Sequence, residues 1–335
     1  MEQKRQNGQT LTSRERVLRT VTFKKPDRLP MDFEIFGYQD VKWVSWNQIG
    51  TGDNSKPRTL DEWGCTWARS EVPNMGLVIG HPLDSWEKMD TFPWPDPDNP
   101  AFYEGMEKKF LGTEDKYITT GIFMLLFERM HSLRGFQNTL EDLYLEPEKI
   151  ADLADRIVDF DLRIIDNISR RFPGRIDGFS FSDDWGTESA CFISPALWDE
   201  FFKPRYKRIF DAVHAAGWQV WMHSCGKVNE IIDSLIDIGV DVLNLQQPRA
   251  LGIEEIGRRF AGRVCFSTLC DIQHTLPFAS DEEVRKEAKL LIDHWATKDG
   301  GLFICDYGDG RAIGVSVERK KLMFEAFREY DPWKS

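Results

Sequence analysis

The chain has 335 residues and is 41% apolar and 13% aromatic, which excludes a disordered or low-complexity protein and predicts a globular one. Its formal net charge of −12 opposes binding to phosphate backbones and anionic membrane surfaces, so we expect neither nucleic acid nor a membrane as a partner. The N-terminal residues lack the apolar core of a secretory signal, and no segment approaches the roughly 20 apolar residues of a membrane span. A cytoplasmic protein is therefore predicted.

Short β-branched or aromatic runs recur along the chain, and each is followed by a turn signal and a helical pattern. We expect strands at residues 29–36, 117–123, 176–182, 218–223, 240–246, 263–269 and 301–305. We expect helices around residues 140–171, 195–216, 228–238, 253–260, 281–297 and 317–330. This alternation predicts parallel strands joined by right-handed crossovers, and the number of strands favours a closed (β/α)₈ TIM barrel over an open sheet.

A long irregular segment separates the first two expected strands. It is rich in glycine and proline over residues 47–57 and again over residues 81–100, so it does not match a barrel helix. We predict one distorted α/β barrel domain over residues 1–335, with an N-terminal helical extension over 1–28 and a capping insertion over 40–115. The chain contains neither a dinucleotide-binding glycine motif after its first strand nor a P-loop, so neither kind of nucleotide site is indicated.

In a parallel barrel, functional residues lie where strands end and the following loops begin. The polar residues expected at those positions are Asp32, Glu34, Asp183, Asp184, His223, Cys225, Gln246, Gln247, Cys270, Asp271, Cys305, Asp306 and Tyr307. Carboxylates, thiols and an imidazole are thus predicted to converge on one end of the barrel.

His223 and Cys225 are the sharpest signal, because two residues apart on a strand their side chains share one face. Nitrogen plus thiolate is a ligand combination that zinc prefers, and a catalytic zinc needs a third protein ligand. Cys305 is the first choice for that ligand, with Glu188 and Cys270 as alternatives. The competing interpretation is that His223 only forms hydrogen bonds inside the barrel and that Cys225 packs as a small apolar residue.

Asp183 and Asp184 end a strand that looks buried, where an unpaired charge would be costly. A metal ion, an arginine or a substrate is the expected partner of one of them. Trp185 follows directly in the sequence, at a position where its side chain could line a cofactor site.

The segments over 11–33, 81–100, 181–189, 193–217 and above all 223–248, which begins HSCGKVNEII, resemble the uroporphyrinogen decarboxylase superfamily. The likeness runs from about residue 11 to residue 330. It implies a distorted (β/α)₈ barrel whose active site lies at the carboxyl ends of the strands.

The superfamily holds two chemistries. True decarboxylases bind a polycarboxylate tetrapyrrole with an arginine-rich segment after the first strand, but here residues 31–40 contain acids and no arginine. The chain is closer to the zinc-dependent methyltransferases of corrinoid systems, whose ligand pattern of His-x-Cys and a distant Cys is matched by His223 and Cys225. Cys305 falls about two residues early in that pattern, which leaves Glu188 or Asp306 open as the third ligand.

The resemblance therefore implies a methyltransferase that moves a methyl group between a small O-, N- or S-methylated substrate and the corrinoid (cobalamin) of a partner protein. Asp183 or Asp184 is expected to act as a general acid toward the leaving group or to orient His223. Residues expected to line the substrate site are Phe36, Tyr38, Phe123, Trp185, Gln246 and Tyr307. The aromatic side chains favour an aromatic methyl ether or a methylated amine and the demethylating direction, with plain core packing as the alternative.

A decarboxylase and a non-catalytic corrinoid- or metal-binding protein remain as alternative functions. A homodimer is left open.

Overall fold

The computed structural model describes residues 10–47, 58–69 and 76–334. Residues 1–9 of the expected extension and residues 48–57 and 70–75 of the expected insertion lie outside the described part. The chain divides into two compact units: unit 1 comprises Met1–Trp43, Gly112–Thr119 and Asp241–Ser335, and unit 2 comprises Val44–Leu111 and Thr120–Val240. None of the helices in the described ranges is both long enough and apolar enough to cross a membrane.

Unit 1 carries a run of strands in the order β2-β1-β12-β11-β10, in which only the β1–β2 pair is antiparallel. The strands are β1 (Met31–Phe33), β2 (Tyr38–Gln39), β10 (Val242–Asn244), β11 (Cys265–Thr268) and β12 (Leu302–Cys305). The same unit holds β3 (Val41–Trp43), which pairs in parallel with the first half of β7 (Tyr117–Ile122).

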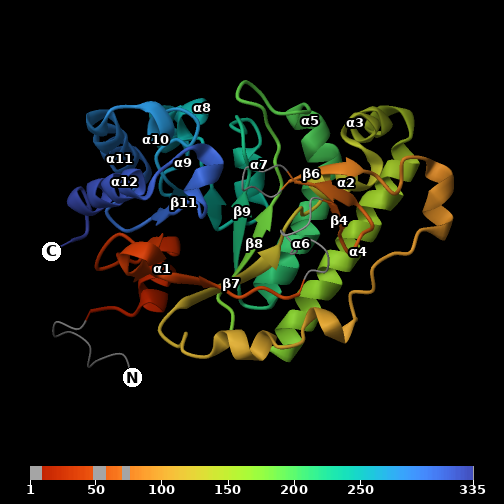
Figure 1. Cartoon of the computed structure of the whole chain (residues 1–335), viewed down its shortest axis with the longest axis horizontal. Helices are drawn as coiled ribbons and strands as arrows, with labels where there is room; N and C mark the ends of the chain where they lie inside the picture. Colours follow the sequence, from red (N-terminus) through yellow and green to blue (C-terminus); the bar gives the residue numbers. More distant parts are fainter. Residues whose placement is uncertain (1–9, 48–57, 70–75, 335) are drawn as a thin grey trace. The chain divides into compact units, whose positions relative to one another are not determined.

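The helices of unit 1 cover one face of these strands. They are α1 (Ser13–Val21), α8 (Pro248–Leu251), α9 (Ile253–Phe260), α10 (Thr275–Phe278), α11 (Asp281–Trp295) and α12 (Val317–Glu329), and Figure 1 draws α9, α11 and α12 in blue. Phe266 of β11 packs against Trp295 of α11, and Phe33 of β1 packs against Phe324 of α12. Because side chains alternate along a strand, the neighbours of Phe33 and Phe266 project from the opposite face.

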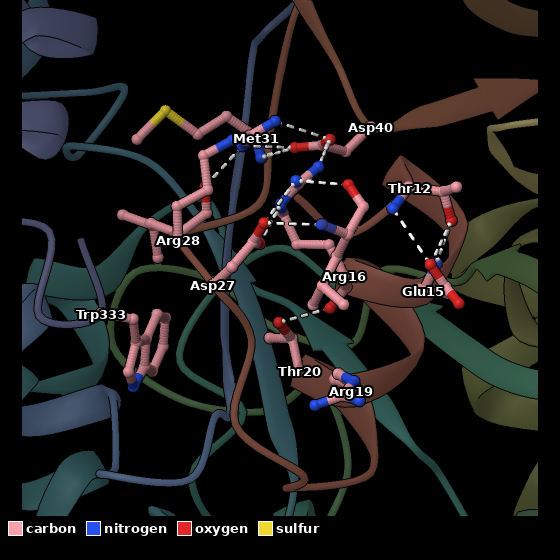
Figure 2. Close-up of polar contacts among 12 residues, drawn as sticks. Thr12, Glu15, Arg16, Arg19, Thr20, Asp27, Arg28, Met31, Asp40 and Trp333 are labelled. Atoms are coloured by element: carbon pink, nitrogen blue, oxygen red, sulfur yellow. Dashed lines mark hydrogen bonds and ion pairs between the residues drawn. The ribbon is translucent and has the colours of Figure 1, made fainter. Parts of the chain in front are cut away.

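The expected N-terminal helix is present as α1, which begins with a capping box formed by Thr12 and Glu15. The buried Asp40 carboxylate lies just before β3 and accepts hydrogen bonds from Arg16, Arg28 and the backbone N–H of Met31, as Figure 2 shows. Arg16 also binds Asp27, so two cations balance two carboxylates, and the network ties α1 to the first residue of β1.

Unit 2 contributes β7 (its second half), β8 (Gly178–Ser182) and β9 (Gln219–His223), with β8 between the other two. Its α-helices are α2 (Phe127–Arg134), α3 (Phe136–Leu145), α4 (Pro147–Arg171), α5 (Pro195–Leu197), α6 (Lys203–Ala215) and α7 (Ile232–Asp237), and a π-helical turn over Trp198–Phe202 joins α5 to α6. Figure 1 shows α4 and α6 side by side, and Arg205 of α6 binds Asp155 of α4.

The part of the expected insertion that the structure describes belongs mostly to unit 2. It forms a three-stranded antiparallel sheet of β4 (Arg58–Leu60), β5 (Thr66–Ala68) and β6 (Leu77–Gly80). The 3₁₀ helices over Trp86–Thr91, Pro100–Phe102 and Met106–Phe110 follow, and no α-helix occurs within the described residues of 40–115.

Nine strands, β1–β3 and β7–β12, make a mostly parallel sheet alternating with helices, which confirms the predicted α/β fold of the (β/α)₈ barrel class. All seven predicted strands are present, and each is shorter than predicted by one to three residues at one or both ends. The two additional strands, β2 and β3, were missed because two or three residues are too few to establish an alternation of apolar and polar side chains.

Candidate functional site

The ends of β8 and β9 bring together most of the residues that the sequence singled out in unit 2. The two strands pair in parallel from Gly178 with Gln219 to Ser182 with His223. Phe181 stacks on Phe210 of α6, so Ser182 and His223 project from the face away from that helix. His223 is therefore delivered to the barrel side of the sheet at the carboxyl end of its strand.

Two glycines hold the loops after these strands close together. Gly226 adopts φ +83°, and a Cβ atom on it would lie 2.2 Å from the carbonyl oxygen of Gly186. A Cβ atom on Gly186 would in turn lie 2.9 Å from the backbone nitrogen of Lys227. The glycines of the DDWG and HSCG motifs are thus required by the direct approach of two backbones.

Asp184, His223 and Cys225 form the one group of three potential metal ligands found among the residues that the structure describes. Cys225 Sγ lies 3.4 Å from His223 Nε2, and that nitrogen lies 3.6 Å from Asp184 Oδ1. The backbone N–H of Cys225 donates to the same Asp184 oxygen at 2.7 Å. All three side chains are half-buried.

These separations fit a tetrahedral zinc ion. Zinc–sulfur bonds of about 2.3 Å and zinc–nitrogen or zinc–oxygen bonds of about 2.0–2.1 Å place tetrahedral ligand atoms about 3.3–3.6 Å apart. The two distances from His223 Nε2 match that range, and the donor set of imidazole, thiol and carboxylate is one that zinc accepts.

The electrostatics of the group also favour a cation. Burial, followed by the nearby carboxylates of Asp184 and Glu128, raises the pKa of the Cys225 thiol. Burial and the charges of Asp183 and Asp184 raise the pKa of Glu128 well above its ordinary value. A cation bound among these groups would offset both effects and favour the thiolate.

Glu128 is a residue of this region that sequence reasoning missed. It lies in the first turn of α2, which follows β7, and Ser182 Oγ is 3.5 Å from its Oε2 atom. Its position just past the end of a predicted strand was the available signal, but an acid on a polar helix has no distinctive motif around it.

Asp183 has a different environment from Asp184. It is fully buried, and its carboxylate accepts hydrogen bonds from the backbone N–H groups of Leu126, Phe127 and Glu128 at 2.7–3.0 Å and from the Tyr206 hydroxyl. Burial raises the pKa of Asp183, and these hydrogen bonds limit the rise. The side chain therefore caps the N-terminus of α2, although the sequence predicts a catalytic role for it.

Trp185, predicted to line the substrate site, lies in the core of unit 2. Its side chain is fully buried, stacks on Phe127 at 4.5 Å between ring centroids, and donates from Nε1 to the Tyr206 hydroxyl at 2.9 Å. Phe123 is half-buried directly after β7, and Glu188 is exposed, outside the group formed by Asp184, His223 and Cys225.

A second set of polar residues lies at the carboxyl ends of the strands of unit 1. Asn244 Nδ2 is 2.9 Å from Ser267 Oγ and 3.4 Å from Cys305 Sγ, and Asn244 Oδ1 accepts from Gln246 Nε2 at 3.2 Å. Asp32 pairs in register with Cys305 on the neighbouring strand. We call Asn244, Ser267, Cys305 and Asp32 the unit 1 polar row.

Charges and burial distinguish the acids of this region. Burial, with the carboxylates of Asp306 and Glu34, raises the pKa of Asp32 to about 7. Lys320 Nζ lies 2.8 Å from the Asp306 carboxylate, so Asp306 is already paired with a cation. Burial raises the pKa of the Cys305 thiol to about 11, although the hydrogen bonds of Asn244 and Ser267 oppose the rise.

The remaining predicted site residues have other partners. Phe36 and Tyr38 pack on Phe324 of α12, and Tyr38 also lies against the guanidinium groups of Arg28 and Arg328. Tyr307 is half-buried next to Asp306. Cys270, an alternative ligand, is fully buried and its thiol lies 3.6 Å from the carbonyl oxygen of Val284.

Comparison with known proteins gives a family and a fold. The model of the uroporphyrinogen decarboxylase (URO-D) family matches residues 117–330. A solved structure of a methyltransferase from Methanosarcina mazei is similar with a TM-score of 0.67 and 14% sequence identity, over 96% of this chain and 99% of that chain. The D-psicose 3-epimerase of Clostridium cellulolyticum H10 is similar with a TM-score of 0.41 and 10% identity, over 73% of this chain and 84% of that chain. No curated protein matches in sequence.

Proposed function

Because the chain belongs to the uroporphyrinogen decarboxylase family, we propose that it is a zinc-dependent methyltransferase, which moves a methyl group between a small methylated substrate and a corrinoid protein. The barrel that it shares with the Methanosarcina mazei methyltransferase is compatible with this activity, and the sequence resemblance to corrinoid methyltransferases supports it. The single observation that carries the proposal is the ligand group of Asp184, His223 and Cys225, spaced as for tetrahedral zinc.

His223 and Cys225 would hold the zinc ion. The geometry of unit 2 offers Asp184 as the third protein ligand, and Cys305 is the alternative that the sequence predicts. When bound, zinc would supply Lewis-acid activation of the oxygen, nitrogen or sulfur atom that carries or receives the methyl group. The acidic groups around Cys225 favour its thiolate only when a cation is present, so metal and thiolate are expected to form together.

Other residues of unit 2 would hold the three ligand side chains in position. The backbone N–H of Cys225 orients the Asp184 carboxylate, and the close approach of Gly186 and Gly226 fixes the two loops. Asp183 anchors the first turn of α2 and so places Glu128 beside Asp184. Glu128, or Asp184 if Cys305 is the third ligand, is then the residue available to hold a proton for the leaving group, whereas the Asp183 carboxylate is occupied by its four donors.

The proposed direction is demethylation of the substrate, with the corrinoid protein as acceptor. The sequence favours an aromatic methyl ether, but Phe36 and Tyr38 pack against α12 and Trp185 is fully buried, so these three rings lend that choice little support.

A uroporphyrinogen decarboxylase is the alternative that the family name suggests. Residues 31–40 provide Asp32 and Glu34 and no arginine, and the nearby Arg16 and Arg28 are both paired with Asp40. We therefore expect no formation of coproporphyrinogen from uroporphyrinogen III at enzymatic rates, because the tetrapyrrole carboxylates would meet like charge.

The direct test is methyl transfer to chemically reduced cobalamin, followed by the change in its visible absorption. We expect methylation of the corrinoid by an O-, N- or S-methyl donor in the presence of the zinc-loaded chain, and at least about a hundredfold loss of rate in His223→Ala. Stoichiometric zinc without turnover on any donor would instead indicate a non-catalytic metal-binding protein.

A further inference from the structure

A cavity of about 390 Å³ lies beside α4 in unit 2. Trp63, Trp94 and Phe160 give it aromatic walls, and Pro95 and Pro97 complete its apolar surface. The ring of Trp63 meets the ring of Phe160 at 4.7 Å and the ring of Trp94 at 6.3 Å between centroids, both edge to face. The volume falls within the range of small-molecule pockets, and the aromatic and proline side chains favour a flat aromatic ligand.

Polar contacts hold the proline-rich segment of this cavity against α4. Asp98, which follows Pro97, accepts a hydrogen bond from Arg163 of α4 at 2.9 Å. Asn167, one turn further along the same helix, donates to the carbonyl oxygen of Pro97 at 3.1 Å and to the Asp98 carboxylate at 2.8 Å. The cavity is therefore formed by the protein itself before any ligand binds.

The free polar groups of the cavity include hydrogen-bond donors. Trp63 is only 3% exposed, and its indole N–H donates to no group within the described residues. Arg156 binds Asp152 through Nε alone, so its Nη1 and Nη2 groups form no hydrogen bond with the described part of the chain. The Arg156 guanidinium also lies 5.3 Å from the centroid of the Trp94 ring, beside an aromatic wall. A ligand that pairs with these donors must bring an acceptor.

The other two charged side chains that line the cavity already have partners. Arg163 binds two carboxylates, one of them that of Asp98, and Asp159 accepts from Arg208 at 2.7 Å. Arg156 is thus the cation whose terminal nitrogens are available to a ligand. Two coplanar N–H donors match the two oxygens of a carboxylate, which is therefore the expected acceptor.

We propose that this cavity binds a small aromatic carboxylate, with the ring against Trp94 and the two prolines and the carboxylate on Nη1 and Nη2 of Arg156. The indole N–H of Trp63 is a further donor for an oxygen of the ligand. The site lies wholly within unit 2, and no member of the ligand group at the end of β9 lines it. It does not depend on the proposed methyl transfer.

Matched ligands test the chemical class. Benzoate, benzyl alcohol and cyclohexanecarboxylate separate the contribution of the charge from that of the ring, and 2-naphthoate with its alcohol and its saturated analogue repeats the comparison on a larger framework. Calorimetry or ligand-observed NMR with the full chain at pH 7.5 should give binding of at least one aromatic carboxylate, with a Kd at least about fivefold lower than for both of its analogues. If neither aromatic carboxylate meets this criterion, the proposal is wrong.

Two variants test the residue. Arg156→Gln removes the charge at an exposed position of α4, so the fold should be retained, and it should weaken binding of the carboxylate at least about tenfold. Arg170→Gln is the matched control, because Arg170 is an exposed, ion-paired arginine of the same helix outside the cavity, and it should change binding less than about twofold. Unchanged binding in Arg156→Gln would refute the assignment.

A third variant separates this cavity from the proposed zinc site, because a carboxylate can also bind zinc. Binding that persists in His223→Ala supports the cavity. Binding that is lost in His223→Ala and retained in Arg156→Gln would place the ligand at the metal group and contradict the proposal.

Discussion

Two strand-end regions of the chain each present a cysteine among polar side chains, but they satisfy the thiol in different ways. In unit 2, Cys225 lies against the ring nitrogen of His223 and near the Asp184 carboxylate, so lone pairs converge. In unit 1, Cys305 lies against the amide of Asn244, which is a hydrogen-bond donor. Converging lone pairs call for a cation, whereas an amide N–H already satisfies a sulfur. The neighbours of a cysteine, and not the cysteine alone, thus determine whether it can serve as a metal ligand.

The largest expected effect is on metal binding at the end of β9. His223→Ala and Cys225→Ala should each lower the affinity for zinc by at least about 100-fold, because each removes one of three protein ligands. Zinc content after dialysis against a weak chelator measures the effect, and Cys191→Ala, which removes a half-buried thiol of unit 2 outside the ligand group, is the control. Full zinc content in both variants would show that His223 and Cys225 are not zinc ligands.

The next largest effect concerns the two adjacent aspartates at the end of β8. Asp183→Ala should lower the free energy of unfolding by about 3 kcal/mol or more, since it leaves three backbone amides, two of them buried, and the Tyr206 hydroxyl without an acceptor. Asp184→Asn, on a half-buried side chain, should cost less than about 1 kcal/mol in the metal-free protein. Urea unfolding separates the two, and equal losses would argue against a capping role for Asp183.

A smaller effect is expected in unit 1, where the carboxylate of Asp32 lies near other acids and opposes folding. Burial and neighbouring acids raise the pKa of Asp32 in the folded chain to about 7, so its stabilising contribution is present at low pH and is lost as the pH rises through 7. Asp32→Asn should therefore raise the free energy of unfolding by about 1–2 kcal/mol at pH 8 and by little at pH 4.

Chemical unfolding of Asp32→Asn across this pH range measures the change, with Glu34→Gln as the control. A loss of stability in Asp32→Asn at pH 8 would mean that the carboxylate has a partner in solution, and a gain that is independent of pH would mean that its charge does not oppose folding.

The smallest expected effect is that of Cys305→Ser on the metal spectrum. In the cobalt(II)-substituted protein, Cys305→Ser should leave the sulfur-to-metal charge-transfer absorption unchanged if Asp184 is the third ligand. Cys225→Ser, the comparison variant, should abolish that absorption. A fall of about half in Cys305→Ser would show that both cysteines bind the metal, as the sequence predicts. Visible absorption at equal metal loading distinguishes the two outcomes.

The sequence by itself determined the order of the strands and helices, and it identified His223 and Cys225 as a pair of candidate metal ligands. Seven strands could be predicted because apolar runs of four or more residues alternate with amphipathic helices, and the close spacing of His223 and Cys225 reflects the geometry of a single strand. Both features are local, because each depends only on residues that are close together in the sequence.

Only the tertiary structure decided which residues from different elements meet. Asp183 and Asp184 are neighbours in sequence, yet one caps α2, which lies more than 50 residues earlier, and the other faces His223. Glu128 and Asn244 could not be found from spacing, because their partners lie on other strands and helices. The direction of each of these side chains depends on packing over long separations in the chain, about which local patterns carry no information.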